Sequence, residues 1–582
     1  MTRAPLFALC LFAALGFAAY ANVLDTFFLS DDFAQIGKVL EGDLSVTWGR
    51  EHGGFFRPAF ILSYFVDAQL WGRRPLGFHL TNVLLHSLNA FLVFLLAARL
   101  TERGDAGETR AMPETTRRET PDTTRQETPS NADAAARSGL SFINAPRRKL
   151  LAYAAGLIFL LHPSHTEAVT WISGRADLLS TLFCLLALLY LIEHARTRRA
   201  APLAFSSLFF ALALLSKEAA LCFPVLAALA GAYFKNEPEA SPEPSARSSP
   251  LKRGALAALP FLYVLAAYVA VRAAALGTLV GGYGAGRHLY LTHGVVASQL
   301  LRAAMRLAFP AVALRALPFL ESRALSPTLI VAGALVVVAA AVALRRADAR
   351  RALARFFRRN KLAWLLVALT VAALLPALNL RINVYDTQGE RFLYLPSVFF
   401  SVLVARALTN GASRGVTWRR IALACLLPLY ALGLWTTNQP WREASALSRR
   451  LVEDVVSQSA RGNVLILNAP DNLRGAYVFR NGFEQALRTF QDAKPFARVA
   501  VVAAHDTHSR DDAVEFEEEA GVLSVALLDA KASFGQAAAE VPCAGVVEAS
   551  ARVVRLRLED CAAEFDLFYF SSGRMRKAGR NQ

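Results

Sequence analysis

The sequence predicts a mostly α-helical membrane protein: a polytopic helical bundle followed by a C-terminal α+β domain outside the membrane. Three observations lead to this fold class. Of the 582 residues, 54% are hydrophobic and only 19% are charged. The apolar residues form long runs, many of which approach the roughly 20 residues that cross a bilayer. After residue 437 the pattern changes to short apolar runs separated by polar turns. This composition excludes a disordered chain, collagen and a small disulfide-bonded scaffold.

The apolar runs predict about eleven transmembrane helices, some of them short and dependent on neighbouring protein rather than lipid. The first run is also typical of a cleaved signal peptide, with Ala-Tyr-Ala at residues 19–21 as the cleavage site, but the many later runs favour a retained helix. Polar residues within 287–316 predict a helix at the membrane surface rather than a further span. The expected spans are residues 4–22, 77–99, 149–162, 177–194, 201–216, 219–234, 254–276, 325–344, 362–379, 393–409 and 420–437.

Basic residues between the spans predict the orientation, because cytoplasmic loops of membrane proteins accumulate Lys and Arg. The net charge is +17, and the basic loops fall on one side if the first span runs outward. We therefore expect a multi-pass protein of a bacterial inner or plasma membrane, with a cytoplasmic N-terminus and a periplasmic or otherwise extracytoplasmic C-terminal domain. The basic loops account for the excess of positive charge, so we expect no nucleic-acid partner. The basic loops are residues 147–149, 196–199, 252–253, 345–358 and 419–420.

The chain divides into two predicted domains, a transmembrane domain of residues 1–437 and an α+β domain of residues 438–582. Two cytoplasmic loops of low complexity, residues 101–146 and 235–251, cannot bury enough apolar surface to offset chain entropy, so we expect them to be disordered. In the second domain the alternating pattern predicts strands and helical stretches, among them residues 482–490. The strands are expected at residues 463–467, 497–503, 522–528, 553–558 and 565–570.

Ionisable residues gather at the span ends on the predicted outer side, as a site at the membrane surface requires. No nucleotide-binding motif occurs, and a sugar transferase outside the cytoplasm must draw its sugar from a lipid phosphate. Such an enzyme needs a carboxylate to deprotonate the acceptor hydroxyl and cations to stabilise the departing phosphate. Asp31 or Asp32 is the candidate base, and the candidate phosphate-binding residues are Lys217, Arg391 and Arg175. Further site candidates are Arg57, His79, His162, His165, Asp177, Glu218 and Glu390.

Taken singly, these features have ordinary explanations. Adjacent aspartates at 31 and 32 are typical of a helix N-terminus, Lys217 and Glu218 of an ion pair, and His162 before a proline of a helix end. Their concentration on one side favours a functional site.

Five motifs occur in order along residues 1–440: Asp31-Asp32, Phe56–His86, His162–Leu179, Leu214–Glu218 and Glu390–Pro396. Together they resemble the C-type (GT-C) polytopic glycosyltransferases, and most closely the transmembrane and TPR-containing O-mannosyltransferases and their bacterial relatives. The named family ends in tandem 34-residue helical repeats, and no such period occurs in the C-terminal region. We therefore expect a GT-C-like bundle in which an α+β domain replaces the repeats.

The resemblance implies an inverting transferase that moves a sugar, with mannose as one candidate, from a polyprenyl-phosphate-linked donor to an acceptor hydroxyl on the outer side. It implies Asp31 as the general base, Asp32 as its neighbour and Glu167 as a second acidic group. The resemblance leaves open whether a divalent metal, Mg²⁺ or Mn²⁺, binds; its ligands would be Asp31, Asp32 and Glu167. The expected partners are the donor lipid, membrane lipids and a protein, lipid or glycan acceptor.

Three other functions remain as alternatives. A transporter or flippase of lipid-linked sugars predicts charges near the bilayer midplane and internal repeats, whereas the candidate charges here lie at span ends. A polysaccharide ligase or polymerase would use the same donor chemistry with a glycan acceptor. A non-catalytic anchor would only display the C-terminal domain.

Overall fold

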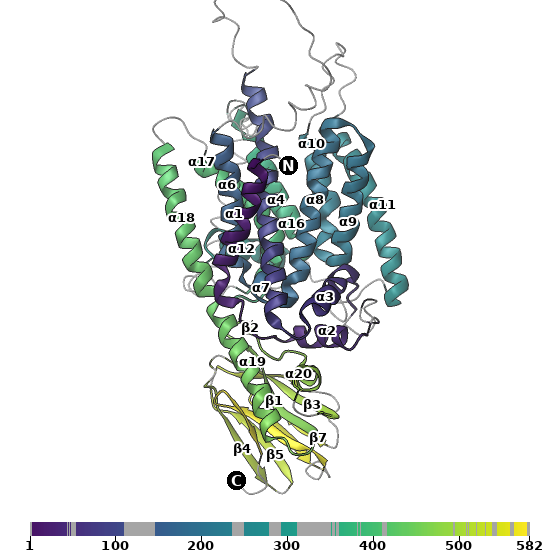
Figure 1. The fold of residues 1–582 in the computed structure, drawn as a ribbon, viewed down its shortest axis with the longest axis vertical. Coiled ribbons are helices and arrows are strands. Elements are labelled where there is room, and N and C mark those ends of the chain that lie inside the picture. The colour runs from purple at the N-terminus through teal and green to yellow at the C-terminus, as the bar shows by residue number, and fades with distance from the viewer. Residues whose placement is uncertain are drawn as a thin grey trace, which may run out of the picture.

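The computed structural model describes residues 3–43, 54–109, 146–234, 249–278, 293–310, 360–409 and 416–578, with short gaps inside the last two ranges and a few single residues between ranges. Most of the two low-complexity loops, the expected span 325–344 and most of the basic segment 345–358 lie outside the described residues. The described chain forms a helical bundle with a strand-rich C-terminal region at one end (Figure 1).

The helices follow the apolar runs of the sequence, and short 3₁₀ turns join several of them. The helices are α1 (Arg3–Ala19), α2 (Asp31–Leu40), α3 (Pro58–Trp71), α4 (Pro75–Thr109), α6 (Pro146–Leu161), α7 (Thr166–Thr170), α8 (Arg175–Thr197), α9 (Ala200–Ser216), α10 (Phe223–Tyr233), α11 (Pro250–Leu276), α12 (His293–Ala308), α16 (Lys361–Leu374), α17 (Tyr394–Thr409), α18 (Val416–Thr437) and α19 (Gln439–Gln458). The turns used below are η5 (Pro163–His165), η6 (Ile172–Gly174), η7 (Glu218–Cys222) and η11 (Glu390–Leu393).

Five helical segments in the described residues are long and apolar enough to cross a membrane, which corrects the expected number of about eleven. Several runs counted as spans form shorter apolar helices, because polar residues and turns end them after 10 to 17 residues. Within residues 287–316 the structure describes one helix, α12, which is not among the five, and its position at the membrane surface stays a prediction. The chain is therefore a mostly α-helical integral membrane protein. The five segments are Pro75–Thr101, Ile172–Thr197, Pro250–Leu276, Glu390–Thr409 and Thr417–Gln458.

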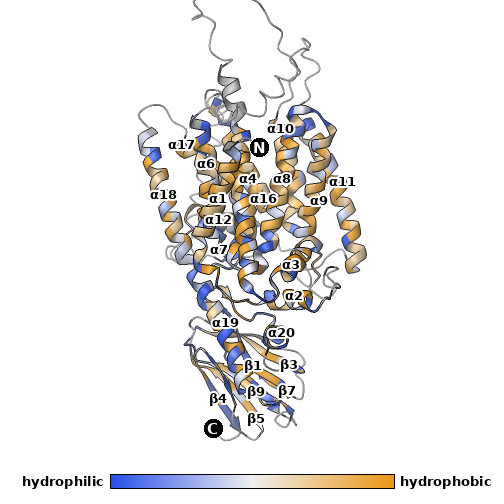
Figure 2. Ribbon diagram, in the orientation of Figure 1, coloured by the Kyte–Doolittle hydropathy of each residue, from blue (hydrophilic) through white to orange (hydrophobic). Residues whose placement is uncertain are grey.

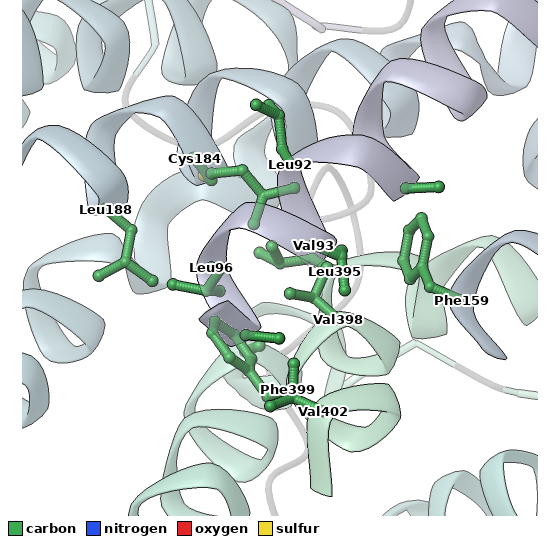
Figure 3. Packing of buried hydrophobic residues seen from close by; sticks show 14 of the residues in the cluster. Leu92, Val93, Leu96, Phe159, Cys184, Leu188, Leu395, Val398, Phe399 and Val402 are labelled. Atoms are coloured by element: carbon green, nitrogen blue, oxygen red, sulfur yellow. The ribbon is translucent and has the colours of Figure 1, made fainter. Parts of the chain in front are cut away.

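Helix α4 lies at the centre of the bundle and packs against α1, α6, α8 and α17. Figure 3 shows its side chains Leu92, Val93 and Leu96 pointing toward buried residues of the neighbouring helices, such as Phe159 and Val398. In contrast, α11 and α18 lie at the periphery and leave many large apolar side chains exposed (Figure 2). An exposed apolar helix face is what a lipid environment accommodates.

The C-terminal region contains two sheets, and each expected strand and the helix expected at 482–490 are confirmed. One sheet has the order β10-β9-β1-β3-β6, with β2 paired to β1, and the other has the order β4-β5-β8-β7. Strand β1 is central and runs parallel to both β3 and β9. The elements are β1 (Asn463–Leu473), β2 (Ala476–Tyr477), α20 (Phe483–Thr489), β3 (Arg498–Thr507), β4 (Val514–Glu519), β5 (Val522–Leu527), β6 (Ser533–Ala537), β7 (Ala544–Ala549), β8 (Val553–Leu558), β9 (Asp566–Ser571) and β10 (Arg574–Lys577).

One hydrophobic core joins the C-terminal region to the segment between α1 and α4, which contains α2 and α3 and is the predicted first outer loop. It combines buried residues of α2, α3, η6, α19 and the β1 sheet. Aromatic rings carry much of this contact: Phe33 stacks on Phe479 with 5.5 Å between centroids, and Phe28 meets Phe490 edge-on at 4.7 Å. The C-terminal region is therefore packed against the loop that carries the acid pair, in addition to being connected through α19.

The sequence-predicted site residues lie at the end of the bundle that carries the C-terminal region. Helices α2, α3 and α7 lie at that end (Figure 1), and η5, η6, η7 and η11 contact α7 or the start of α8. This arrangement brings the other four sequence motifs, which are far apart in the chain, into contact with the motif His162–Leu179 at α7 and the start of α8.

Candidate active site

The acid pair opens α2, as expected for aspartates at a helix N-terminus. Asp32 is buried. Its Oδ1 accepts hydrogen bonds from the backbone N–H of Ser173, at 2.8 Å, and from the Ser173 hydroxyl, at 2.5 Å. Its Oδ2 accepts a hydrogen bond from the backbone N–H of Leu29 at 3.0 Å. Asp32 therefore ties the first outer loop to η6, in the second motif.

Burial raises the pKa of the Asp32 carboxyl to about 7. The loss of water around the carboxylate is the main cause, and the nearby Asp31 adds a smaller effect in the same direction. The hydrogen bonds from Ser173 and Leu29 oppose this rise because they stabilise the ionised form.

Asp31 has a different environment, because it is partly exposed. Its Oδ1 accepts a hydrogen bond of 2.7 Å from the side-chain amide of Asn481, in the C-terminal region. The hydroxyl of Ser30 approaches the same oxygen at 3.4 Å. Asp32 is thus the buried anchor of the loop, and Asp31 is the more accessible of the two carboxylates.

Glu167, at the start of α7, is fully buried and joins three segments of the chain. It forms an ion pair with Arg391, whose backbone N–H also donates to Glu167 Oε2 at 2.9 Å. The hydroxyl of Tyr477, in β2, donates to Glu167 Oε1 at 3.0 Å and accepts from Arg391 Nη1 at 2.9 Å. Burial raises the pKa of Tyr477, which keeps this hydroxyl protonated as a donor.

The second candidate cation, Lys217, forms an ion pair of 2.5 Å with Asp177, and both side chains are 5% exposed. Lys217 and Arg391 both lie against the ring of Phe392, with Lys217 Nζ 5.4 Å and Arg391 Cζ 4.9 Å from its centroid. The two predicted phosphate-binding residues are thus neighbours, although they come from motifs about 170 residues apart in the sequence.

Arg391 is connected to the acid pair through Trp171 rather than by direct contact. The guanidinium of Arg391 lies 5.1 Å from the Trp171 ring centroid, and the indole N–H of Trp171 donates to the carbonyl of Leu29 at 3.3 Å. Leu29 in turn binds Asp32. The ion-pair partners of Lys217 and Arg391 are Asp177 and Glu167 rather than the two aspartates.

Arg175 does not fit the predicted role in phosphate binding. It is completely buried and forms an ion pair of 2.5 Å with Asp67. It also donates to Asn82 Oδ1 at 2.8 Å and to the carbonyl of Phe78 at 2.9 Å. Because protein groups take up its donors, Arg175 holds α3, α4 and α8 together, and we leave it out of the donor site.

Two further ion pairs that include candidate site residues also lie inside the protein. Arg57 binds Glu218 at 2.6 Å in a largely buried ion pair that joins the start of α3 to η7. Glu390, at the start of η11, forms a fully buried ion pair with Arg306 of α12. These pairs fix the positions of segments that carry Lys217 and Arg391.

The candidate histidines make hydrogen bonds inside the bundle rather than at the acid pair. His79 Nε2 contacts the hydroxyl of Thr26 at 2.9 Å, His162 Nε2 contacts the carbonyl of Leu307 at 3.0 Å, and His165 Nε2 contacts Ser397 at 2.7 Å. All three rings are buried. The structure therefore gives His79, His162 and His165 packing roles.

A divalent metal does not fit the arrangement of the acidic residues. Among the described residues, no group of three His, Cys, Asp or Glu side chains is placed to hold a metal ion. Both oxygens of Asp32 and both of Glu167 accept hydrogen bonds from protein donors. We derive no step through a metal.

Several residues of the site were missed from the sequence. Ser173 and Phe392 lie inside recognised motifs, but nothing in a serine or phenylalanine marks a contact with a distant aspartate or lysine. A role for Asp67 could have been predicted, because a lone acid inside an apolar helical run requires a cationic partner. Tyr477 and Asn481 carry no signal, because only the packing of the C-terminal region brings them to the site.

Known proteins similar to this chain are named protein O-mannosyl-transferases. The chain is 30% identical over 234 residues to protein O-mannosyl-transferase Tmtc1 of Drosophila melanogaster, covering 37% of this chain and 22% of the relative. It is 31% identical over 201 residues to protein O-mannosyl-transferase TMTC2 of Mus musculus, covering 32% and 18%, and 28% identical over 206 residues to TMTC4 of Homo sapiens, covering 32% and 23%. The chain thus spans about a fifth of the length of these relatives. No protein-family model and no solved structure matches it.

These similarities confirm the relationship to O-mannosyltransferases that the motifs predicted. Fold and comparisons together define the chain as an integral membrane protein related, over about a third of its length, to proteins of that name.

We predict that Arg175→Met destabilises the fold by about 3–5 kcal/mol, because it leaves the buried Asp67 carboxylate without its cation. The double variant Asp67→Asn, Arg175→Met should recover part of the loss. Thermal unfolding in detergent measures both, and Arg73→Met, whose ion pair is exposed, is the control with little effect. If Arg175→Met is as stable as wild type but binds donor lipid more weakly, Arg175 belongs to the donor site and the structural role is wrong.

The raised pKa of Asp32 predicts a pH-dependent stability. Because the folded protein holds this proton more tightly than the unfolded chain, unfolding becomes easier as pH rises from about 4 to about 7, by up to about 4 kcal/mol. The neutral side chain of Asp32→Asn removes this dependence. The unfolding temperature of wild type should therefore fall relative to that of Asp32→Asn across this range and then level off. Parallel curves for the two proteins would show that Asp32 keeps an ordinary pKa.

Proposed function

We propose that this chain is a membrane glycosyltransferase that moves a sugar from a polyprenyl-phosphate-linked donor to an acceptor hydroxyl at the membrane surface, with inversion. The observation that carries the proposal is the identity of about 30% to proteins named protein O-mannosyl-transferase. The gathering of acids and cations at one end of the bundle supports it, because these are the groups that sugar transfer from a lipid phosphate requires.

Lys217 and Arg391 are the residues we assign to the donor phosphate. Their shared contact with Phe392 brings two positive charges together at the end of apolar helices, where a lipid phosphate would lie. Their ion pairs with Asp177 and Glu167 hold the side chains in place before the donor binds. A bound phosphate would then be stabilised by preorganised cations, without further ordering of long side chains.

Asp31 is the proposed general base. In the transfer step, Asp31 takes the proton of the acceptor hydroxyl while the acceptor oxygen bonds to the anomeric carbon of the sugar. The bond from that carbon to the phosphate oxygen breaks, and polyprenyl phosphate leaves with the electron pair. Attack from the face opposite the phosphate inverts the anomeric configuration. The partial exposure of Asp31, in contrast to the burial of Asp32, supports this assignment.

The sugar and the acceptor follow from the relatives alone. Their names specify mannose and protein, so we propose mannose and a protein hydroxyl first, with lipid and glycan acceptors as further members of the same reaction class.

The proposed orientation places the site outside the cytoplasm. Basic residues such as Arg148, Arg198, Arg253 and Arg419 lie at the starts of α6, α11 and α18 or at the end of α8. In a bundle whose helices alternate in direction, these positions fall at the end opposite the acid pair, as the long run of α18 and α19 toward the sheets illustrates (Figure 1). By the preference of basic loops for the cytoplasm, the C-terminal region is then extracytoplasmic.

The test is a transfer assay with the purified full chain in lipid, radiolabelled polyprenyl-phosphate mannose as donor and a Thr-rich peptide as acceptor. We predict that Asp31→Asn lowers transfer about 10²- to 10⁴-fold, the usual contribution of a general base, while the protein stays folded. Asp25→Asn removes an exposed carboxylate of the same loop and should leave transfer unchanged.

Two results would contradict the proposal. Undiminished transfer in Asp31→Asn would remove Asp31 from the mechanism. Movement of the labelled lipid across the bilayer without any bond formation would instead identify a flippase.

A further inference from the structure

The short segment from β2 to the start of α20 reaches the acid pair from the C-terminal region. Within it, Asn481 donates its side-chain amide to Asp31 Oδ1 at 2.7 Å. Three residues earlier, the carbonyl of Val478 accepts the backbone N–H of Ser30 at 2.9 Å. The segment therefore binds both the side chain of Asp31 and the backbone that precedes it.

Ser30 has an unusual backbone conformation, with φ +49°. Residues other than glycine rarely adopt the left-handed region, and such strain persists only where surrounding contacts hold it in place. Here the contact is the hydrogen bond to Val478. Because Ser30 directly precedes Asp31, its conformation sets the direction in which α2 begins and hence where the Asp31 carboxylate lies.

The approach of the segment is close. Gly482 has φ +85°, and a Cβ at this position would lie 2.6 Å from the carbonyl oxygen of Ser30 and 2.9 Å from Cβ of Phe33. No other residue type fits there without moving the backbone. The contact between the C-terminal segment and the first outer loop is thus tightly packed rather than incidental.

The same segment also reaches the proposed phosphate-binding cation. Tyr477 lies between Glu167 and Arg391, donating to the first and accepting from the second. Its hydroxyl is buried. One continuous stretch of seven residues therefore contacts the proposed base at one end and the proposed donor cation at the other.

We infer that residues 476–482 of the C-terminal region complete the active site, with Asn481 as a positioning residue for Asp31 and Tyr477 as a positioning residue for Arg391. This inference rests on the proposed function. The Asn481 amide occupies Oδ1 of Asp31, which leaves Oδ2 to receive the acceptor proton, and it fixes the direction of the carboxylate. The Tyr477 hydroxyl fixes the guanidinium that faces the donor phosphate. The C-terminal region is then part of the catalytic unit rather than a separate module carried by the bundle.

For Asn481, the test compares three single variants of the full chain in the transfer assay. Asn481→Ala should lower kcat about ten- to a hundred-fold with little change in the KM for donor lipid. Asn481→Gln, which keeps an amide donor, should recover part of the activity. Thr489→Ala is the matched control, because it removes another hydrogen bond across the same interface, to Glu41 at 2.8 Å, away from the acid pair; it should behave as wild type.

For Tyr477, the expected effect falls on donor binding instead. Tyr477→Phe keeps the ring and its packing but loses both hydrogen bonds. It should raise the KM for polyprenyl-phosphate mannose about ten-fold and leave kcat near the wild-type value. Equal effects of Tyr477→Phe and Asn481→Ala on both constants would contradict separate positioning roles.

The outcomes separate this inference from the proposed function. If Asp31→Asn abolishes transfer while Asn481→Ala matches wild type, the function stands and the inference is wrong. If wild type transfers no sugar, the function is wrong, and hydrogen exchange decides the inference: Asn481→Ala should speed exchange of the backbone amides of residues 30–34, and Thr489→Ala should not. Unchanged exchange in Asn481→Ala would overturn it.

Discussion

The hydrogen bonds between the buried Asp32 carboxylate and Ser173 are the constraint on which the rest of the site depends. They join the first outer loop to the second motif, so α2 cannot move independently of α7 and α8. From Ser173 the same short stretch leads to Trp171, which lies against Arg391, and to Asp177, which binds Lys217. A single buried carboxylate thereby sets the distance between the partly exposed Asp31 and two cations from other parts of the chain.

Charge pairing is the second organising rule of this end of the bundle. A charged group with little access to water is costly unless it meets an opposite charge, and the cations singled out by the sequence accordingly have carboxylate partners. The pairs differ in exposure: those of Arg175 and Arg306 are sealed, whereas Arg391 keeps 11% of its side chain exposed. Arg391 therefore remains near the surface, where we propose that the lipid phosphate binds.

Much of this architecture was predictable from local sequence patterns. Apolar runs located the helices, and alternating runs located the strands that contain Val464 and Leu567, because these signals depend on neighbouring residues. Among the described residues, fewer helices are long enough to span a membrane than the apolar runs predicted, since an apolar run does not reveal where a helix turns. The motifs of the site could be predicted, but the contacts between their residues could not. Arginine and histidine are common in functional sites, and only tertiary packing shows that Arg175 and His165 are buried. Asn481 could not be predicted at all, because its role depends on how a distant region folds back.

We propose that this end of the bundle binds a sugar linked to polyprenyl phosphate. Mass spectrometry of lipids that remain bound to the purified protein tests this directly. We predict a polyprenyl phosphate carrying one hexose, retained in Asp31→Asn because binding does not need the base, and lost when Lys217 and Arg391 are both replaced by Ala. Recovery of ordinary membrane phospholipids alone, or equal retention of the sugar lipid in the Lys217 and Arg391 double variant, would contradict it.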